Sequence, residues 1–378
     1  MRKGCQLFYA TDFQSLMYPC FTFCRILGIF PYKINKSTFE ASDSCYILSA
    51  IVISIFCIYG IIILHELNMS GTVMYISIPR SLERHSYYVL GIFIAITTYV
   101  LRNPRLLLLQ TIMNVSLKLP SESYKKLSIL IHIKDILGFF FIIILTLVCM
   151  MKRPLNSILV TIFGMYLSLL LLQMDMLYVN CVCVLNLCFK RINHNLTKVQ
   201  EFVLTDESHL LRQVYYKQRN SFLIIKLKAL KKQHLMVSDT VQILNMTFSL
   251  QLIATIITSF SEITFNLYFY IVLSMAKEEE EFWYWFFLIS VIYYTIKILL
   301  IVWVCDSGTN QATKIGITVH NLLNNTSNKQ IKNELQLFSM QILHRDNVFS
   351  AKGLTVDATL LTGRCDFIKG LMRTKLLI

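Results

Sequence analysis

Residues 155–189 read LNSILVTIFGMYLSLLLLQMDMLYVNCVCVLNLCF and contain one charged side chain, Asp175, in 35 positions. A hydrocarbon core about 30 Å thick is crossed by about 20 residues of α-helix. The segment is therefore long enough to cross a membrane and to continue beyond it. It predicts an all-α protein embedded in a membrane.

Apolar segments on both sides of this one are also long enough to cross a membrane. They are residues 45–64, about 87–101, about 130–151, about 241–276 and 282–305. Residues 347–378 are a candidate for one more span, although their last part is unusually charged. The sequence thus predicts a polytopic seven-span helical bundle with a degenerate seventh span.

The composition supports a membrane protein and excludes several other classes. The chain is 55% hydrophobic with a mean hydropathy of +0.56, and only 15% of its residues are charged, against about 25% in soluble domains. The net charge is +14, but the basic residues stand between apolar runs, which favours a juxtamembrane role over nucleic-acid binding. The 11 cysteines are scattered and mostly apolar in context, so free thiols are expected rather than a disulfide framework. No catalytic, metal or cofactor motif is present, and no enzyme is predicted.

The distribution of basic residues predicts the orientation. With the amino terminus inside the cell, loops on the inner side hold 25 lysines and arginines and those on the outer side hold 5. Positive charge concentrates on the cytoplasmic side of membrane proteins. The amino terminus is therefore predicted to be cytoplasmic, which is the inverse of a G-protein-coupled receptor.

The long inner segment 190–240 has the pattern of helices rather than of a disordered loop. Apolar residues recur at helical spacing in both halves: Leu196, Val199, Phe202 and Val203, then Leu223, Leu227 and Leu230. The segment is predicted to extend the fourth and fifth spans into the cytoplasm.

A family resemblance rests on two stretches, residues 174–196 and 320–361. The second contains, in order, His320-Asn321-Leu322-Leu323, Glu334-Leu335, Phe338, Gln341, Phe349-Ser350-Ala351, Gly353, and Asp357 followed by Leu360-Leu361. Together with the spans, this pattern resembles insect gustatory receptors. Insect odorant receptors share the architecture and are the alternative, but the Phe-Ser-Ala-x-Gly and Asp-x-x-Leu-Leu spacing favours the gustatory side.

The resemblance implies a ligand-gated, non-selective cation channel in the plasma membrane, assembled as a homo- or heterotetramer and opened by a small-molecule tastant. It implies a cytoplasmic segment 1–44, a six-span ligand-binding bundle 45–305, an intracellular anchor 306–346 that includes a helix at 332–343, and a pore segment 347–378. Phe349, Asp357, Leu360 and Leu361 would then serve the pore and its gating.

The terminal residues depart from that family. Residues 362–378 carry Arg364, Asp366, Lys369, Arg373 and Lys375, which would lie on two opposite sides of a helix. A charge in mid-membrane costs about 2.5–3.5 kcal/mol on insertion scales. A non-functional, truncated or frame-altered receptor product is therefore a second alternative. A secondary transporter is a third, although no internal repeat is evident.

The ligand candidates are polar and aromatic residues expected in the outer half of the bundle. They are Tyr88, Thr161, Tyr166, Glu262, Phe265 and Trp283. Glu262 is the strongest candidate, because an ionisable group inside a membrane is a functional hypothesis by default. The alternative is a structural role, in which Glu262 pairs with a group such as a hydroxyl on a neighbouring helix. For Trp283, the role of an interfacial anchor is favoured over ligand contact. Asp175 and Lys297 are expected to pair internally.

Overall fold

The computed structural model describes residues 8–30, 32–35, 38–69, 77–151, 158–204, 213–276 and 281–356, and these are mostly helical. The predicted pore residues Asp357, Leu360 and Leu361, and the charged residues 362–378, lie outside the described residues. The all-α prediction is confirmed.

Long apolar helices make up most of the described chain. Five of them are long and apolar enough to cross a membrane: α3 (Asp43–Met69), α6 (Ser121–Met151), α7 (Ile158–Leu204), α8 (Gln213–Ala276) and α9 (Glu281–Asn324). A sixth candidate is the pair α4 (Ser77–Val100) and α5 (Arg102–Ser116), if these are one span with a bend of 66° between them. The described residues therefore support up to six spans, and residues 357–378 of the predicted seventh span lie outside them.

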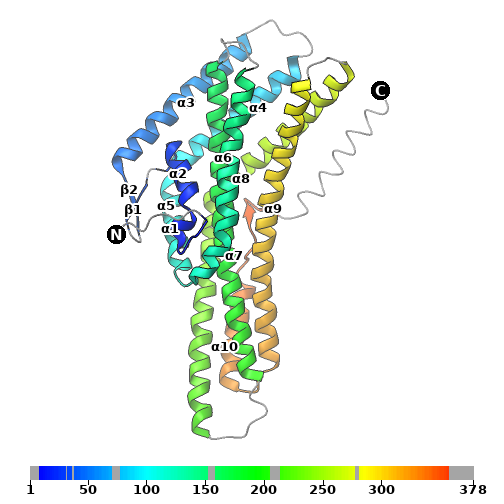
Figure 1. Ribbon diagram of the computed structural model, residues 1–378. Helices are drawn as coiled ribbons and strands as arrows, with labels where there is room; N and C mark the ends of the chain where they lie inside the picture. Colours follow the sequence, from blue (N-terminus) through cyan, green and yellow to red (C-terminus); the bar gives the residue numbers. More distant parts are fainter. Residues whose placement is uncertain are drawn as a thin grey trace. The chain divides into compact units, whose positions relative to one another are not determined.

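Both arms of the segment predicted as helical extensions are helical. Helix α7 continues to Leu204 and helix α8 begins at Gln213, and Figure 1 shows both as long continuous ribbons. The apolar residues that recur at helical spacing are buried, namely Leu196, Val199, Leu223, Leu227 and Leu230. Two residues of the predicted set are exceptions, since Val203 is half-buried and more than half of Phe202 is exposed.

The chain forms two compact units. Unit 1 comprises the described parts of Met1–Gln110, Tyr124–Asn180 and Thr247–Ile301, and unit 2 comprises those of Thr111–Ser123, Cys181–Met246 and Val302–Ile378. Helices α7, α8 and α9 contribute residues to both. In unit 1, α3 and α4 approach closely at Gly60, where an added Cβ would lie 2.5 Å from Cδ1 of Ile92.

Unit 1 begins with small elements that apolar periodicity did not reveal. These are α1 (Phe13–Leu16), α2 (Tyr18–Ile26) and the antiparallel hairpin of β1 (Tyr32–Asn35) and β2 (Thr38–Ala41). Asp12 caps the first turn of α1, and Gly28, with φ of +71°, ends α2 in a conformation that suits glycine. The hydroxyl of Tyr32 donates to the carbonyl of Arg102, and burial raises the pKa of Tyr32 to about 12.

Unit 2 contains α10 (Lys329–Leu343), at the place where the resemblance implies an anchor helix. Asn328 caps its start by accepting from the backbone N–H groups of Gln330 and Ile331. Glu334 of α10 accepts a hydrogen bond from Lys231 of α8 at 3.0 Å, and the amide of Gln341 donates to the carbonyl of Lys231. These contacts hold α10 against α8.

A short antiparallel pair follows α10, formed by β3 (Ser350–Ala351) and β4 (Leu354–Thr355). Its turn has positive φ at Lys352 and Gly353. Phe349, which precedes β3, is only 1% exposed and packs on α9, where a Cβ added to Gly308 would lie 2.5 Å from Cε2 of Phe349. The candidate gating residue Phe349 is thus a buried contact within unit 2.

Candidate functional site

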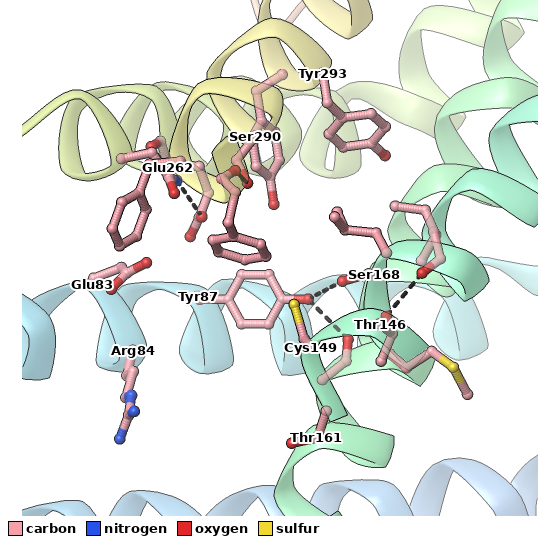
Figure 2. Close-up of a pocket in the computed structure, with 18 of the residues that line it drawn as sticks. Glu83, Arg84, Tyr87, Thr146, Cys149, Thr161, Ser168, Glu262, Ser290 and Tyr293 are labelled. Atoms are coloured by element: carbon pink, nitrogen blue, oxygen red, sulfur yellow. Dashed lines mark hydrogen bonds between the residues drawn. The ribbon is translucent and has the colours of Figure 1, made fainter. Parts of the chain in front are cut away.

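A cavity of about 220 Å³ lies within unit 1. It is lined by side chains from α4, α6, α7, α8 and α9, and Figure 2 shows how they converge on it. The volume is below the ~300–1,000 Å³ range of typical ligand pockets. The cavity therefore suits a small molecule.

Aromatic rings form much of the lining. They come from α4 and from the first turns of α9: Tyr87, Tyr88, Trp283, Phe286, Phe287, Tyr293 and Tyr294. Several pack edge to face, with ring centroids 5.8 Å apart for Trp283 and Phe286 and 5.0 Å apart for Tyr293 and Tyr294. Rings in such contact are held in place by one another, so the aromatic surface is preformed.

Most hydroxyl groups around the cavity are already hydrogen-bonded inside the protein. The hydroxyl of Tyr87 donates to the carbonyl of Gly164 and lies 2.6 Å from Oγ of Ser168, as the dashed lines in Figure 2 mark. Ser290 and Thr146 donate to backbone carbonyls of their own helices. These groups shape the wall and offer little hydrogen-bonding capacity to a ligand.

Glu262 is a buried acidic group in the lining. Its residue is 7% exposed, and its Oε2 accepts a long contact of 3.3 Å from the amide of Asn266, one turn along α8. Within the described part of the chain no lysine, arginine or histidine forms a salt bridge with it. Burying a carboxylate without a counter-ion costs free energy. Glu262 is therefore the lining residue that says most about what the cavity binds.

A second carboxylate, Glu83, shares the space near Glu262. Both residues line the cavity, and their charges interact. Figure 2 shows Glu83 directed toward Glu262, whereas Arg84 points away from it on the other side of α4. The guanidinium groups of Arg80 and Arg84 belong to exposed residues. The negative charge is therefore on the inner wall and the positive charge at the periphery.

Beyond the cavity, a buried ion pair ties α7 to α9 in unit 1. Nζ of Lys297 lies 3.1 Å from Oδ2 of Asp175, and Thr255 donates to Oδ1 of the same aspartate at 2.7 Å. The predicted internal pairing of Asp175 and Lys297 is confirmed. Because Lys297 is bound to Asp175, Glu262 keeps no salt-bridge partner on that side.

The structure brings four of the six predicted ligand residues to one cavity. Tyr88, Thr161, Glu262 and Trp283 all line it. Tyr166 does not: its hydroxyl donates to the carbonyl of Leu27 at 3.0 Å, and its ring stacks on Phe56 at 3.6 Å. Phe265 is half-buried and is also absent from the lining.

Other lining residues were not singled out from the sequence, although a signal for them exists. On α9, Phe286, Ser290 and Tyr293 follow Trp283 at intervals of three or four residues, which places them on one helix face. On α4, Arg80 and Glu83 precede Tyr87 at the same spacing. Extending each aromatic candidate along its own helix face would have found them.

Comparisons with known proteins concern the family and the fold of the chain. Residues 17–363 match the sequence profile of a family described as the 7tm chemosensory receptors. A stretch of 134 residues is 33% identical to gustatory receptor 28b of Drosophila melanogaster, which covers 34% of this chain and 28% of that protein. The match thus spans less than a third of the relative's length.

The fold has a solved counterpart. The structure of the insect olfactory receptor OR5 from Machilis hrabei superimposes with a TM-score of 0.66 over 96% of this chain and 97% of that one, at 12% sequence identity. At that identity the likeness concerns the fold alone. The family that the sequence profile describes, the chemosensory receptors, is not an enzyme family.

Proposed function

The chain belongs to the 7tm chemosensory receptor family, and we propose that it is a gustatory receptor subunit: a ligand-gated, non-selective cation channel that a small-molecule tastant opens. The family is one of multi-pass membrane proteins. The observation that carries the proposal is the preformed aromatic cavity in unit 1, with the buried carboxylate of Glu262 in its wall. A concave, largely aromatic pocket with a few polar groups in its wall is typical of sites that bind small molecules.

The taste assignment rests on sequence. The relative that is 33% identical over 134 residues carries the name of a gustatory receptor, and the Phe349-Ser350-Ala351, Gly353 and Asp357 spacing favours the same side. We place Tyr88, Thr161, Glu262 and Trp283 at the tastant. The pore and its gate are assigned to Phe349 and to Asp357, Leu360 and Leu361.

Assembly with other subunits, as a homo- or heterotetramer, is part of the proposal. Large apolar side chains of unit 2 are exposed on α9 and on α10, including Trp303, Ile317, Leu337, Met340 and Leu343, the last 84% exposed. Apolar surface of this extent is covered in the working protein by lipid or by another protein chain. Since α10 is not among the candidate spans, we assign Leu337, Met340 and Leu343 to subunit contacts.

We further propose that the chain lies in the plasma membrane with its amino terminus in the cytoplasm. The excess of 25 basic residues over 5 between the two sets of loops supports this orientation. An epitope tag at the amino terminus, stained before and after permeabilisation, tests it. Staining of intact cells would contradict it.

Whole-cell recording in transfected cells tests the channel. Perfusion of a tastant panel is expected to evoke an inward current that reverses near 0 mV, as in a non-selective cation pore. A chain ending after Thr355 retains the described helices and Phe349 but lacks the proposed pore residues Asp357, Leu360 and Leu361, and it should reach the surface without conducting. A current of equal size from this shortened chain, or no current from surface-expressed full-length protein with any compound, would refute the channel assignment.

A further inference from the structure

We propose that the cavity of unit 1 selects a protonated amine carried on a small aromatic frame, with Glu262 as its counter-ion; this inference rests on the proposed receptor function. It names a class of ligand and the group that recognises it.

The first step concerns the charge of Glu262. The residue is more than nine-tenths buried, and the only side-chain contact to its carboxylate in the described structure is the 3.3 Å contact from Asn266. A buried carboxylate either stays protonated or meets a cation. Lys297 is bound to Asp175 at 3.1 Å and forms no salt bridge with Glu262, so a cationic ligand would supply the counter-ion that keeps Glu262 ionised.

The second step concerns the surroundings of that carboxylate. Tyr87, Tyr293 and Tyr294 line the same cavity, and the faces of such rings attract cations. The protein already uses one of them in this way, since Nζ of Lys297 lies 5.2 Å from the centroid of the Tyr294 ring. Glu83 also lines the cavity and is directed toward Glu262 in Figure 2. Rings and carboxylates together suit an organic cation.

The third step concerns the hydrogen-bonding capacity that the wall offers to an uncharged polyol. A sugar needs many hydrogen-bond partners, but the hydroxyls of Tyr87, Ser290 and Thr146 are bonded within the protein. A polyol that displaces water from the cavity would leave several of its own hydroxyl groups without a hydrogen-bond partner, at a cost of about 1–3 kcal/mol for each. The cavity volume of about 220 Å³ also favours a compact ligand.

Binding to the full-length protein in lipid nanodiscs tests the inference. The probes are phenethylamine and tryptamine, which are protonated at pH 7, and their alcohol counterparts 2-phenylethanol and tryptophol. A charge-assisted hydrogen bond should make at least one amine bind about tenfold or more tighter than its alcohol. Equal affinity of amine and alcohol in both pairs, or no binding of either amine, would overturn the inference.

Variants of Glu262 test whether its charge is what distinguishes the amine from the alcohol. Glu262→Gln keeps the shape of the side chain and should lose about tenfold of amine affinity while alcohol affinity is unchanged. Glu122→Gln alters an exposed carboxylate of α6 and is the matched control. If Glu262→Gln does not fold, as judged by its size-exclusion profile, Glu262→Asp keeps the charge and should keep the amine preference. Wild-type amine affinity in a folded Glu262→Gln protein, or loss of the preference in a folded Glu262→Asp protein, would refute the role of Glu262.

Binding and current recordings separate this inference from the proposed function. If amines bind and no compound evokes a current, the channel assignment fails and the cavity chemistry stands. If only uncharged compounds evoke a current and amines do not bind, the receptor function stands and the amine inference fails.

Discussion

Lys297 and Asp175 form an ion pair in which both side chains are at least 97% buried and Nζ lies 3.1 Å from Oδ2. Thr255 completes the site by donating to the other carboxylate oxygen. The pair joins α7 to α9 within unit 1. It also fixes the lysine whose charge would otherwise be available to Glu262.

Removal of one partner from this pair should destabilise the protein strongly. Lys297→Met leaves Asp175 buried without its cation, and breaking a buried pair in this way costs about 3–5 kcal/mol. The expected result is a large fall in the thermal unfolding midpoint of the detergent-solubilised protein. The double variant Lys297→Met with Asp175→Leu removes both charges and should recover most of the loss. A single variant as stable as the wild type would contradict the pairing.

The contact between Gly308 and Phe349 predicts a steric effect in unit 2. An alanine Cβ at position 308 would lie 2.5 Å from Cε2 of Phe349, so Gly308→Ala should overpack the contact at a cost of about 1–3 kcal/mol. Replacing the ring in the same chain, as Gly308→Ala with Phe349→Leu, should restore part of the stability. Thermal unfolding of the three proteins measures this. Gly316→Ala is the control, because its nearest heavy atom to an added Cβ is at 3.6 Å.

Glu334 predicts a pH dependence of stability in unit 2. Burial raises the pKa of this carboxyl, but the hydrogen bond and charge of Lys231 and the charge of Lys228 outweigh burial, and the pKa is lowered from its ordinary value. A carboxyl whose pKa is lower in the folded state contributes stability above its unfolded pKa of about 4.3, and this stability is lost as pH falls through the folded pKa.

The unfolding midpoint should therefore drop between pH 5 and pH 3 more steeply for the wild type than for Glu334→Gln. Unfolding of the purified protein across this range measures the difference. Glu122→Gln, which changes an exposed carboxylate, should follow the wild-type curve. Parallel curves for wild type and Glu334→Gln would show that the contact with Lys231 contributes nothing to stability.

Apolar length was enough to predict most of the helices, but not their ends. The run around Asp175 predicts a helix longer than a bilayer, and α7 extends from Ile158 to Leu204. Helix α4 begins at Ser77, well before the predicted span at residues 87–101, because Arg80, Glu83 and Arg84 hide its first turns from a hydropathy reading. The bend of 66° between α4 and α5 coincides with Pro104 in the first turn of α5, a residue that breaks a continuous helix but that hydropathy does not register.

The cavity could be predicted only in part, for a related reason. Each candidate residue was identifiable alone as a polar or aromatic group in an apolar helix, but the lining depends on how five helices are rotated against one another. Tyr166 shows the limit, because its position on α7 is close in sequence to Gly164 and Ser168, which line the cavity. Its ring turns instead to Phe56 of α3, a contact that periodicity within α7 cannot reveal.

Tyr166 also provides a test that separates stability from recognition. Its hydroxyl donates to the carbonyl of Leu27 at 3.0 Å and does not line the cavity. Tyr166→Phe should therefore lose about 1 kcal/mol of stability while its amine affinity stays at the wild-type value. Tyr88→Ala, by contrast, removes a ring from the cavity wall and should weaken the binding of amine and alcohol together. Binding curves in nanodiscs, paired with unfolding midpoints, measure both effects. A Tyr166→Phe protein with wild-type stability and weakened binding would place this hydroxyl at the ligand instead.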